Sequence, residues 1–201
     1  MTIQERRRLL GLAATLSAAV LTSPARAQAP AAAPAAAPAP LPPPDARAML
    51  EQFEKSGRGF DMRPGVKAAT TVYVVFDPQC PWCAKFWDSA KPIAERVRFV
   101  WLPVAVLNPR SEPQGAAILA SANPVETMEA NEAQLPKGGL PIDTLAPPMA
   151  AREDVWSNSR IYRRTGGRTV PFAVYRDAQG QAATIPGYLP PEELKKVLGL
   201  S

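Results

Sequence analysis

The chain has 201 residues, with 23 basic and 18 acidic side chains, two cysteines and no histidine. Four of the basic side chains and one acidic side chain fall within positions 1–27, so the rest of the chain has 19 basic against 17 acidic, a net charge of +2. No basic stripe with interleaved aromatics remains to indicate nucleic-acid binding. Two cysteines without histidine supply half of a tetrahedral zinc site, so we expect no metal. The alternatives are a metal shared between two chains and a site completed by carboxylate ligands.

Positions 1–27 have the order of a secretory signal peptide. Arg6, Arg7 and Arg8 precede an apolar stretch over 9–21, and Ala25-Arg26-Ala27 predicts cleavage before Gln28. The apolar stretch is short for a membrane span, although an uncleaved anchor is the alternative. We therefore expect export to the periplasm, by the Sec route or, given the paired arginines, the twin-arginine route.

Residues 28–44 are almost wholly alanine and proline, which predicts a semi-rigid linker with no face to bury. Residues 45–201 are then long enough for one domain with a sizeable core. Within that domain, a polar, proline-containing stretch over about 108–166 predicts a helical insert.

The domain is predicted to be of the α/β class. The predicted helices cover residues 45–55 (capped by Asp45), 80 onward, 113–121, 124–131, 149–164 and 190–198. The predicted strands cover residues 70–76, 98–106, 171–176 and 181–185. Pro103 favours an edge position or a bulge for the second strand, because proline cannot donate to a sheet. This order is that of a thioredoxin-like fold in which a helical insertion separates the cysteine-bearing helix and its following strand from the strand at Pro171.

Cys80 and Cys83 lie close together in the chain, with two positions between them, directly after the strand predicted over 70–76 and at the start of a helix. A helix N-terminus lowers the pKa of a cysteine from about 8.5 into roughly the 3.5–7.5 range, and Pro81 suits the first helical position. A structural disulfide across so short a loop would stabilise the fold little. The spacing therefore predicts a redox-active Cys80–Cys83 disulfide; a structural bridge remains the alternative.

Three segments resemble the periplasmic thiol:disulfide interchange proteins of the DsbC/DsbG family, DsbG in particular: residues 76–87, residues 116–121 and Val170-Pro171. The resemblance covers about residues 51–200. It implies that Cys80 is the nucleophile that forms a mixed disulfide with a substrate protein, and that Cys83 resolves it. It also implies a cis Pro171 beside the cysteines, which leaves the Val170 backbone free to pair with an extended substrate.

The same resemblance gives supporting roles to Pro81, Trp82 and Thr169. Trp82 is expected either to offer an apolar surface to substrates or to pack against Pro78 or the loop before Pro171. Asp77 is expected to form a turn, with tuning of Cys80 as the alternative. Trp87, Trp101 and Trp156 are expected in the core, and the resemblance implies no organic cofactor.

The sequence departs from the family in two respects. Only the linker and one short helix precede the catalytic domain, where the isomerases carry a dimerisation domain, so we expect a monomer or weak dimer. Val170 stands where those isomerases have threonine, which is more like the DsbA oxidases. We expect reduction or isomerisation of disulfides in unfolded or misoxidised exported proteins, with a membrane thiol donor of the DsbD type. The alternatives are a DsbA-like oxidase recharged by a quinone-linked partner, and a non-catalytic chaperone.

Overall fold

The structure is a computed structural model and describes residues 41–200. The predicted signal peptide (1–27) and residues 28–40 of the predicted linker lie outside this part. Among the described residues, no helix is long and apolar enough to cross a membrane.

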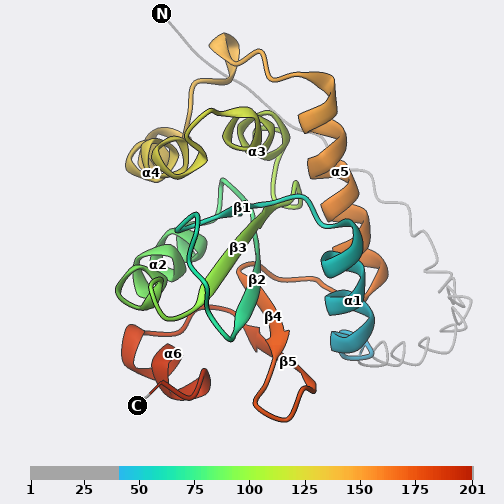
Figure 1. The fold of residues 1–201 in the computed structure, drawn as a ribbon. Coiled ribbons are helices and arrows are strands. Elements are labelled where there is room, and N and C mark those ends of the chain that lie inside the picture. The colour runs from blue at the N-terminus through green and yellow to red at the C-terminus, as the bar shows by residue number, and fades with distance from the viewer. Residues whose placement is uncertain (1–40, 201) are drawn as a thin grey trace, which may run out of the picture. The chain divides into compact units, whose positions relative to one another are not determined.

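Six α-helices and five strands follow one another along the described chain (Figure 1). The helices are α1 (Ala46–Ser56), α2 (Pro81–Ala90), α3 (Ser111–Ala120), α4 (Pro124–Gln134), α5 (Met149–Arg164) and α6 (Pro191–Val197). The strands are β1 (Phe60–Asp61), β2 (Thr71–Phe76), β3 (Arg98–Pro103), β4 (Phe172–Arg176) and β5 (Ala182–Pro186). Short 3-10 helices cover Lys91–Ile93, Leu135–Lys137 and Ile142–Thr144.

The strands form one mixed sheet in the order β1-β3-β2-β4-β5. Strands β2 and β3 are parallel, and the other neighbouring pairs are antiparallel. In β2, the central strand, Val74 pairs with Trp101 on one side and with Ala173 on the other. Because side chains alternate along a strand, the central strands contribute to hydrophobic clusters on both faces.

Helices cover both faces of this sheet (Figure 1). On one face, Phe86 and Trp87 of α2 and Leu194 of α6 pack with the Val72, Val74 and Phe76 side chains of β2. On the other face, the buried side chains come from α1, α5 and the alternate strand positions; they are Met49, Leu50, Phe53, Tyr162, Val75, Leu102, Val104, Phe172 and Val174. Cys80 and Cys83 belong to the first cluster, so the thiols lie at the margin of the α2-side core.

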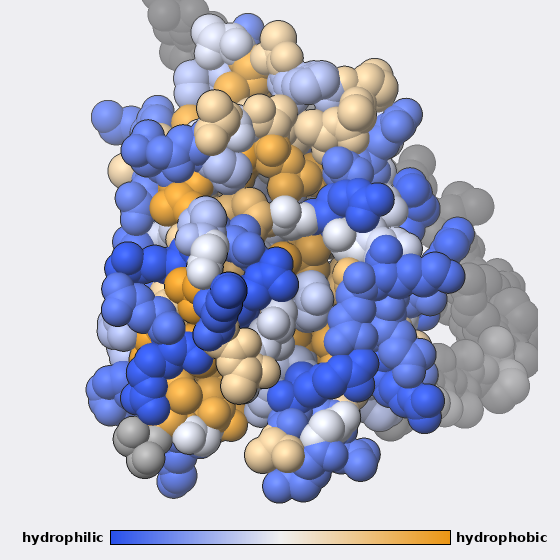
Figure 2. Space-filling view, viewed as in Figure 1, coloured by the Kyte–Doolittle hydropathy of each residue, from blue (hydrophilic) through white to orange (hydrophobic). Residues whose placement is uncertain are grey.

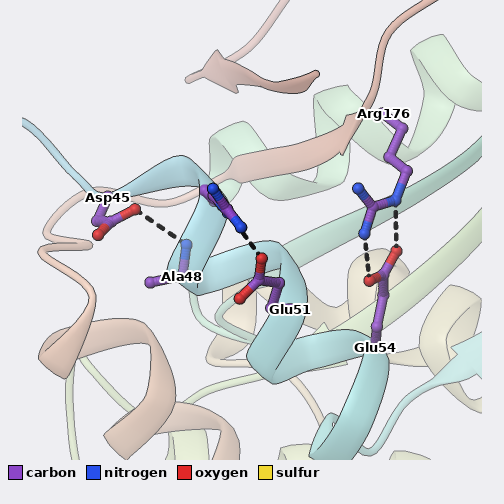
Figure 3. Close-up of polar contacts among 6 residues, drawn as sticks. Asp45, Ala48, Glu51, Glu54 and Arg176 are labelled. Atoms are coloured by element: carbon purple, nitrogen blue, oxygen red, sulfur yellow. Dashed lines mark hydrogen bonds and ion pairs between the residues drawn. The ribbon is translucent and has the colours of Figure 1, made fainter. Parts of the chain in front are cut away.

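Helix α1 begins where the sequence predicts. The Asp45 carboxylate accepts a hydrogen bond from the Ala48 N–H at 2.9 Å, which satisfies one of the free donors of the first turn (Figure 3). At the other end of the helix, Glu54 forms two hydrogen bonds to Arg176 of β4, at 3.0 and 2.7 Å. The helix is thereby tied to the sheet through both its apolar face and an ion pair.

Helices α3, α4 and α5 lie between β3 and β4 in the chain, where the helical insertion was expected. Helices α3 and α4 stand above the end of the sheet, and α5 runs down beside α1 (Figure 1). On the same face of the molecule, Figure 2 shows mostly hydrophilic residues over α1, whereas hydrophobic residues are interspersed among polar ones on the side of α2 and α4.

Two expectations are wrong, and one strand was not predicted. The unpredicted strand is the short β1, which pairs with β3 at Trp101 and Val100. Strand β3 is consequently not at the edge of the sheet; it ends at Pro103, beyond the last residue that β1 covers. Trp156, expected in the core, is 39% exposed, because it lies outside the buried face of α5. That face is formed by Ala151, Val155, Asn158, Ser159 and Tyr162.

Candidate active site

The cysteine pair occupies the N-terminus of α2. Cys80 is the N-cap residue, with φ −98° and ψ 110°, and its sulfur accepts a hydrogen bond from the Cys83 N–H at 3.3 Å. Pro81 stands at the first helical position, where a backbone N–H would have no partner within the helix. Both cysteines are free thiols in this structure. The first turn of the helix therefore directs donors at the Cys80 sulfur.

The pKa values of the two thiols are shifted in opposite directions. Hydrogen bonds from the Cys83 side chain and from the backbone of Cys83 and Trp82 lower the pKa of Cys80 below its ordinary value, against the opposing effect of burial. Burial raises the pKa of Cys83 well above the ordinary value, and the neighbouring Cys80 adds to the rise. Cys80 is 4% exposed and Cys83 is fully buried. Cys80 is thus the thiol that ionises and the one nearer to solvent.

The segment before β4 lies directly against Cys80. The Cys80 thiol donates to the Val170 carbonyl at 3.5 Å, and the Val170–Pro171 peptide bond is cis. Thr169 is anchored from α5, because its carbonyl accepts a hydrogen bond from the Tyr162 hydroxyl and its N–H donates to the same oxygen at 3.2 Å. Residues 80 and 170, remote in sequence, therefore meet at one site.

Tyr162 can reach Thr169 because a glycine lies beneath its ring. A Cβ atom on Gly167 would overlap the Tyr162 ring carbons. Burial also raises the pKa of the Tyr162 hydroxyl to about 12, so this group stays protonated and can donate to the Thr169 carbonyl.

Trp82, between the cysteines, is 52% exposed. Its ring lies 5.7 Å from the Tyr188 ring, centroid to centroid, and the Lys85 ammonium lies 4.1 Å from its centroid. Trp82 therefore packs against the segment that follows β5, which is not one of the two partners expected from the sequence, and it still presents a hydrophobic surface beside Cys80.

Asp77 is fully buried and serves the turn before the cysteines. One of its carboxylate oxygens accepts the Gln79 N–H at 2.9 Å, and the other accepts the N–H groups of Val106 and Leu107 at 2.8 and 3.0 Å. These bonds join the end of β2 to the loop after β3. They support the turn interpretation of Asp77.

Several polar residues near the site have no counterpart in the sequence analysis. Gln114 of α3 and Asn131 of α4 are fully buried, and both hydrogen-bond the segment that precedes Cys80. Gln114 accepts from the Gln79 side chain, and Asn131 donates to the Pro78 carbonyl. Glu132, also on α4, has two buried carboxylate oxygens without a hydrogen-bond partner among the described residues. Burial raises the pKa of Glu132 to about 8, and the charges of Cys80 and Asp88 add to the rise. No local pattern identifies these residues, because each acts on a segment remote in the sequence.

The described residues contain no group of three or more histidine, cysteine or acidic side chains arranged to hold a metal ion.

The sequence profile of the thioredoxin-like domain matches residues 65–200, which include the cysteine pair and the Val170–Pro171 segment. The chain belongs to the thioredoxin-like family. This match and the arrangement of strands and helices confirm the predicted fold class. The position of the insert, α3 to α5, agrees as well.

Among thioredoxin-like proteins, the chain is similar to two thiol:disulfide interchange proteins named DsbG. It is 29% identical over 158 residues to the one from Pseudomonas aeruginosa, covering 78% of this chain and 60% of that protein. It is 30% identical over 159 residues to the one from Escherichia coli, covering 78% and 62%. The matched part of the chain thus spans about three-fifths of the length of these relatives. This similarity confirms the expected resemblance to the DsbC/DsbG family.

Among solved structures, the catalytic domain of ScsC from Proteus mirabilis has the same fold. The TM-score is 0.62 at 15% sequence identity, and the match covers 77% of this chain and 96% of that domain.

Proposed function

We propose that the chain is a periplasmic protein thiol:disulfide oxidoreductase that reduces or isomerises disulfides of exported proteins through Cys80 and Cys83. The observation that carries this proposal is the geometry of the two thiols at the start of α2: the Cys80 sulfur caps the helix and accepts the Cys83 N–H at 3.3 Å, while the Cys83 thiol is fully buried behind it. Disulfide exchange needs one thiol that ionises readily and a second that is held back until the first has reacted. The similarity to two DsbG proteins supports the same chemistry.

The proposed reaction consists of two successive thiol–disulfide exchange steps. The Cys80 thiolate attacks one sulfur of a substrate disulfide; the substrate S–S bond breaks, a Cys80–substrate disulfide forms, and the other substrate sulfur leaves as a thiolate that takes up a proton. Cys83 then loses its proton and attacks the Cys80 sulfur, which closes the Cys80–Cys83 disulfide and releases the second substrate thiolate. In isomerisation, another thiolate of the substrate attacks the substrate sulfur of the Cys80–substrate disulfide instead of Cys83. A new disulfide then forms within the substrate, and Cys80 is released as a thiolate.

We propose that substrate binding is supported by Pro81, Trp82 and the segment 169–171. The Val170 carbonyl lies 3.5 Å from the Cys80 sulfur, so an extended substrate strand that pairs with this segment would bring its disulfide to the nucleophile. Trp82 is half-exposed beside the same sulfur and offers a surface for the apolar side chains of unfolded proteins. Thr169 is held by Tyr162 and supports the segment from behind.

The location and partners follow from the same proposal. The signal pattern of positions 1–27 supports export to the periplasm. After each reduction, a membrane thiol donor of the DsbD type would return two electrons and two protons to the Cys80–Cys83 disulfide.

A DsbA-like oxidase, recharged by a quinone-linked oxidant, is the second candidate. Val170 before Pro171 favours it, because threonine stands there in the resembling isomerases. The reduction potential of the mature protein, measured by equilibration with glutathione buffers, tests both candidates. A value between about −230 and −120 mV is expected for a catalytic disulfide, and the oxidase gains support towards the upper end. A value below about −300 mV would indicate a structural bridge and overturn the exchange mechanism.

The Cys80→Ser variant separates the enzyme from a chaperone. Serine also accepts a hydrogen bond as a helix N-cap, so we expect the fold to persist while reduction of a disulfide-bonded test protein falls to the uncatalysed rate. A chaperone that binds through Trp82 would keep its ability to suppress aggregation in Cys80→Ser and lose it in Trp82→Ala. Undiminished disulfide reduction by Cys80→Ser would sink the proposal.

A further inference from the structure

Three side-chain amides lie between the helical insert and the segment that precedes Cys80. They are Gln79 in that segment, Gln114 on α3 and Asn131 on α4. Gln114 and Asn131 are fully buried, and the thiol chemistry described above uses none of the three. A buried amide is costly unless its donors and acceptor are satisfied, so their partners are informative.

Gln114 uses both ends of its amide. Its Nε2 donates to the carbonyls of Gly138 and Leu140, each at 2.8 Å, and its Oε1 accepts a hydrogen bond from Gln79 Nε2 at 2.6 Å. Gln79 Nε2 also donates to the Gly138 carbonyl at 2.8 Å. The side chain of the residue directly before Cys80 is therefore fixed to α3 and to the turn after α4.

Asn131 holds the preceding residue. Its Nδ2 donates to the Pro78 carbonyl at 2.8 Å, and its Oδ1 accepts the Leu140 N–H at 3.0 Å. Helices α3 and α4 thus hold two successive residues, 78 and 79, immediately ahead of the nucleophile. The insert contacts the reactive turn through specific hydrogen bonds in addition to apolar packing.

The backbone after α4 is shaped to fit between these amides. Gly139 has φ +73°, and a Cβ there would lie 2.6 Å from Asn131 Oδ1 and 2.8 Å from Gln114 Nε2. Only glycine adopts this conformation at so close an approach. The turn and the three amides therefore form one fitted unit, which we call the amide clamp (Gln79, Gln114, Asn131 and Gly138–Gly139).

The amide clamp lies where it can control the sulfur. The low pKa of Cys80 depends on the placement of its Sγ near the N–H groups of the first turn of α2, the Cys83 N–H among them at 3.3 Å. That placement is set by the backbone of Cys80 and of the residues that lead into it. Because thiolate stabilisation declines steeply with hydrogen-bond distance and angle, a small shift of residues 78–79 weakens it.

We propose that Gln114 and Asn131 are positioning residues for Cys80, and that the helical insert sets the acidity and the reduction potential of the dithiol through the amide clamp. This inference rests on the proposed function. It gives the insert a role that purely apolar packing would not provide.

The test is the thiolate titration of the full mature protein, followed by ultraviolet absorbance, in wild type and in Gln114→Ala. We expect the variant to raise the Cys80 pKa by about 0.5 to 1 unit, which corresponds to about a three- to tenfold smaller thiolate fraction at a pH below the transition. The reduction potential, measured by equilibration with glutathione buffers, should become more negative in the variant, because the thiolate form of the reduced protein is less stabilised.

Asn158→Ala is the matched control. Asn158, on α5, is also a fully buried amide with three backbone hydrogen bonds, to the N–H and carbonyl of Arg58 and to the Pro103 carbonyl, but none of these bonds goes to residues 78–79. We expect a comparable loss of stability and an unchanged Cys80 pKa. Equal pKa shifts in the two variants, or none in Gln114→Ala, would overturn the inference.

Gln79→Ala keeps the inference testable if Gln114→Ala fails to fold. Gln79 is only half-buried, and its removal leaves the Asn131–Pro78 bond in place, so we expect a folded protein with a smaller upward shift. An unshifted pKa in folded Gln79→Ala would overturn the inference. The proposed function fails differently: the wild-type protein itself would then show no thiol that ionises below the ordinary range.

Discussion

Two helices of this domain begin with the same contact. Asp45 at the start of α1 accepts the Ala48 N–H at 2.9 Å, and Cys80 at the start of α2 accepts the Cys83 N–H at 3.3 Å. Asp45 is exposed, whereas Cys80 is 4% exposed. Both positions stabilise negative charge. The N-cap contact alone is therefore structural, and the difference lies in the capping group: at Cys80, a second thiol and the first-turn N–H groups lower the pKa of a sulfur against the opposing effect of burial.

The largest difference that this comparison predicts is between the two thiols of α2. In the reduced protein at neutral pH, we expect iodoacetamide to modify Cys80 on the order of 100-fold faster than Cys83, because Cys80 ionises more easily and Cys83 is fully buried. The rate at Cys80 should rise with pH and level off below the ordinary thiol range of about 8.5. Mass spectrometry of timed samples measures both rates, and equal modification would contradict the assignment of Cys80 as nucleophile.

The next effect concerns a carboxylate that, unlike Asp45, has no partner among the described residues. Glu132 faces Asp88 of α2 and Lys91 of the 3-10 helix that follows α2, with Glu129 on its own helix, and burial raises its pKa to about 8. Folding therefore favours the protonated form of Glu132. The loss of stability from burying the ionised carboxylate is absent below the pKa of the unfolded chain, about 4.3, grows as pH rises, and is complete above the pKa in the folded protein. We expect Glu132→Gln to stabilise the fold by about 1 to 3 kcal/mol above pH 8 and little near pH 5.

Urea unfolding at the two pH values measures this difference. The comparison is best made in a Cys80→Ser background, which removes the titration of the Cys80 thiol. Glu153→Gln, an exposed position on α5, is the control and should change stability little at either pH. Stabilisation by Glu132→Gln that does not depend on pH would show that the carboxylate is already neutral or solvated across the range.

The smallest effect is expected at Asp45 itself. Asp45→Ala should lower the free energy of unfolding by about 1 kcal/mol, because the Ala48 N–H loses its partner, while Asp45→Ser should retain most of the stability. Neither variant should change the thiolate titration of Cys80. A change in that titration would mean that the two helix starts are coupled, and the comparison would no longer hold.

The sequence predicts the elements whose pattern is local. Helix α5 has the predicted bounds, Met149–Arg164, because apolar residues recur at helical spacing between proline and glycine signals. The start of α2 follows from Pro81 after Cys80. The contact between Cys80 and Val170 could be predicted only from the resemblance to a known family, since nothing in the sequence between them indicates it.

What the sequence does not predict depends on pairing at a distance. Strand β1 is too short to show any periodicity, and it exists because Phe60 and Asp61 pair with β3. Gln114, Asn131 and Glu132 resemble ordinary polar residues of solvent-facing helices. Gln114 and Asn131 are fully buried because the insert packs onto residues 78–79, and the carboxylate oxygens of Glu132 are buried beside α2. Their type carries no signal, because glutamine and asparagine are common on exposed helix surfaces.

The glycine beneath Tyr162 has a consequence for how this chain can vary. Position 167 carries no reactive group, yet any larger side chain there would displace the ring whose hydroxyl holds Thr169 beside the cis bond. A change at this position would therefore move Thr169 and its neighbour Val170, which contacts the Cys80 sulfur, although both cysteines would remain in the sequence. Tolerance to substitution near the dithiol is limited by the space around Tyr162 as well as by sulfur chemistry.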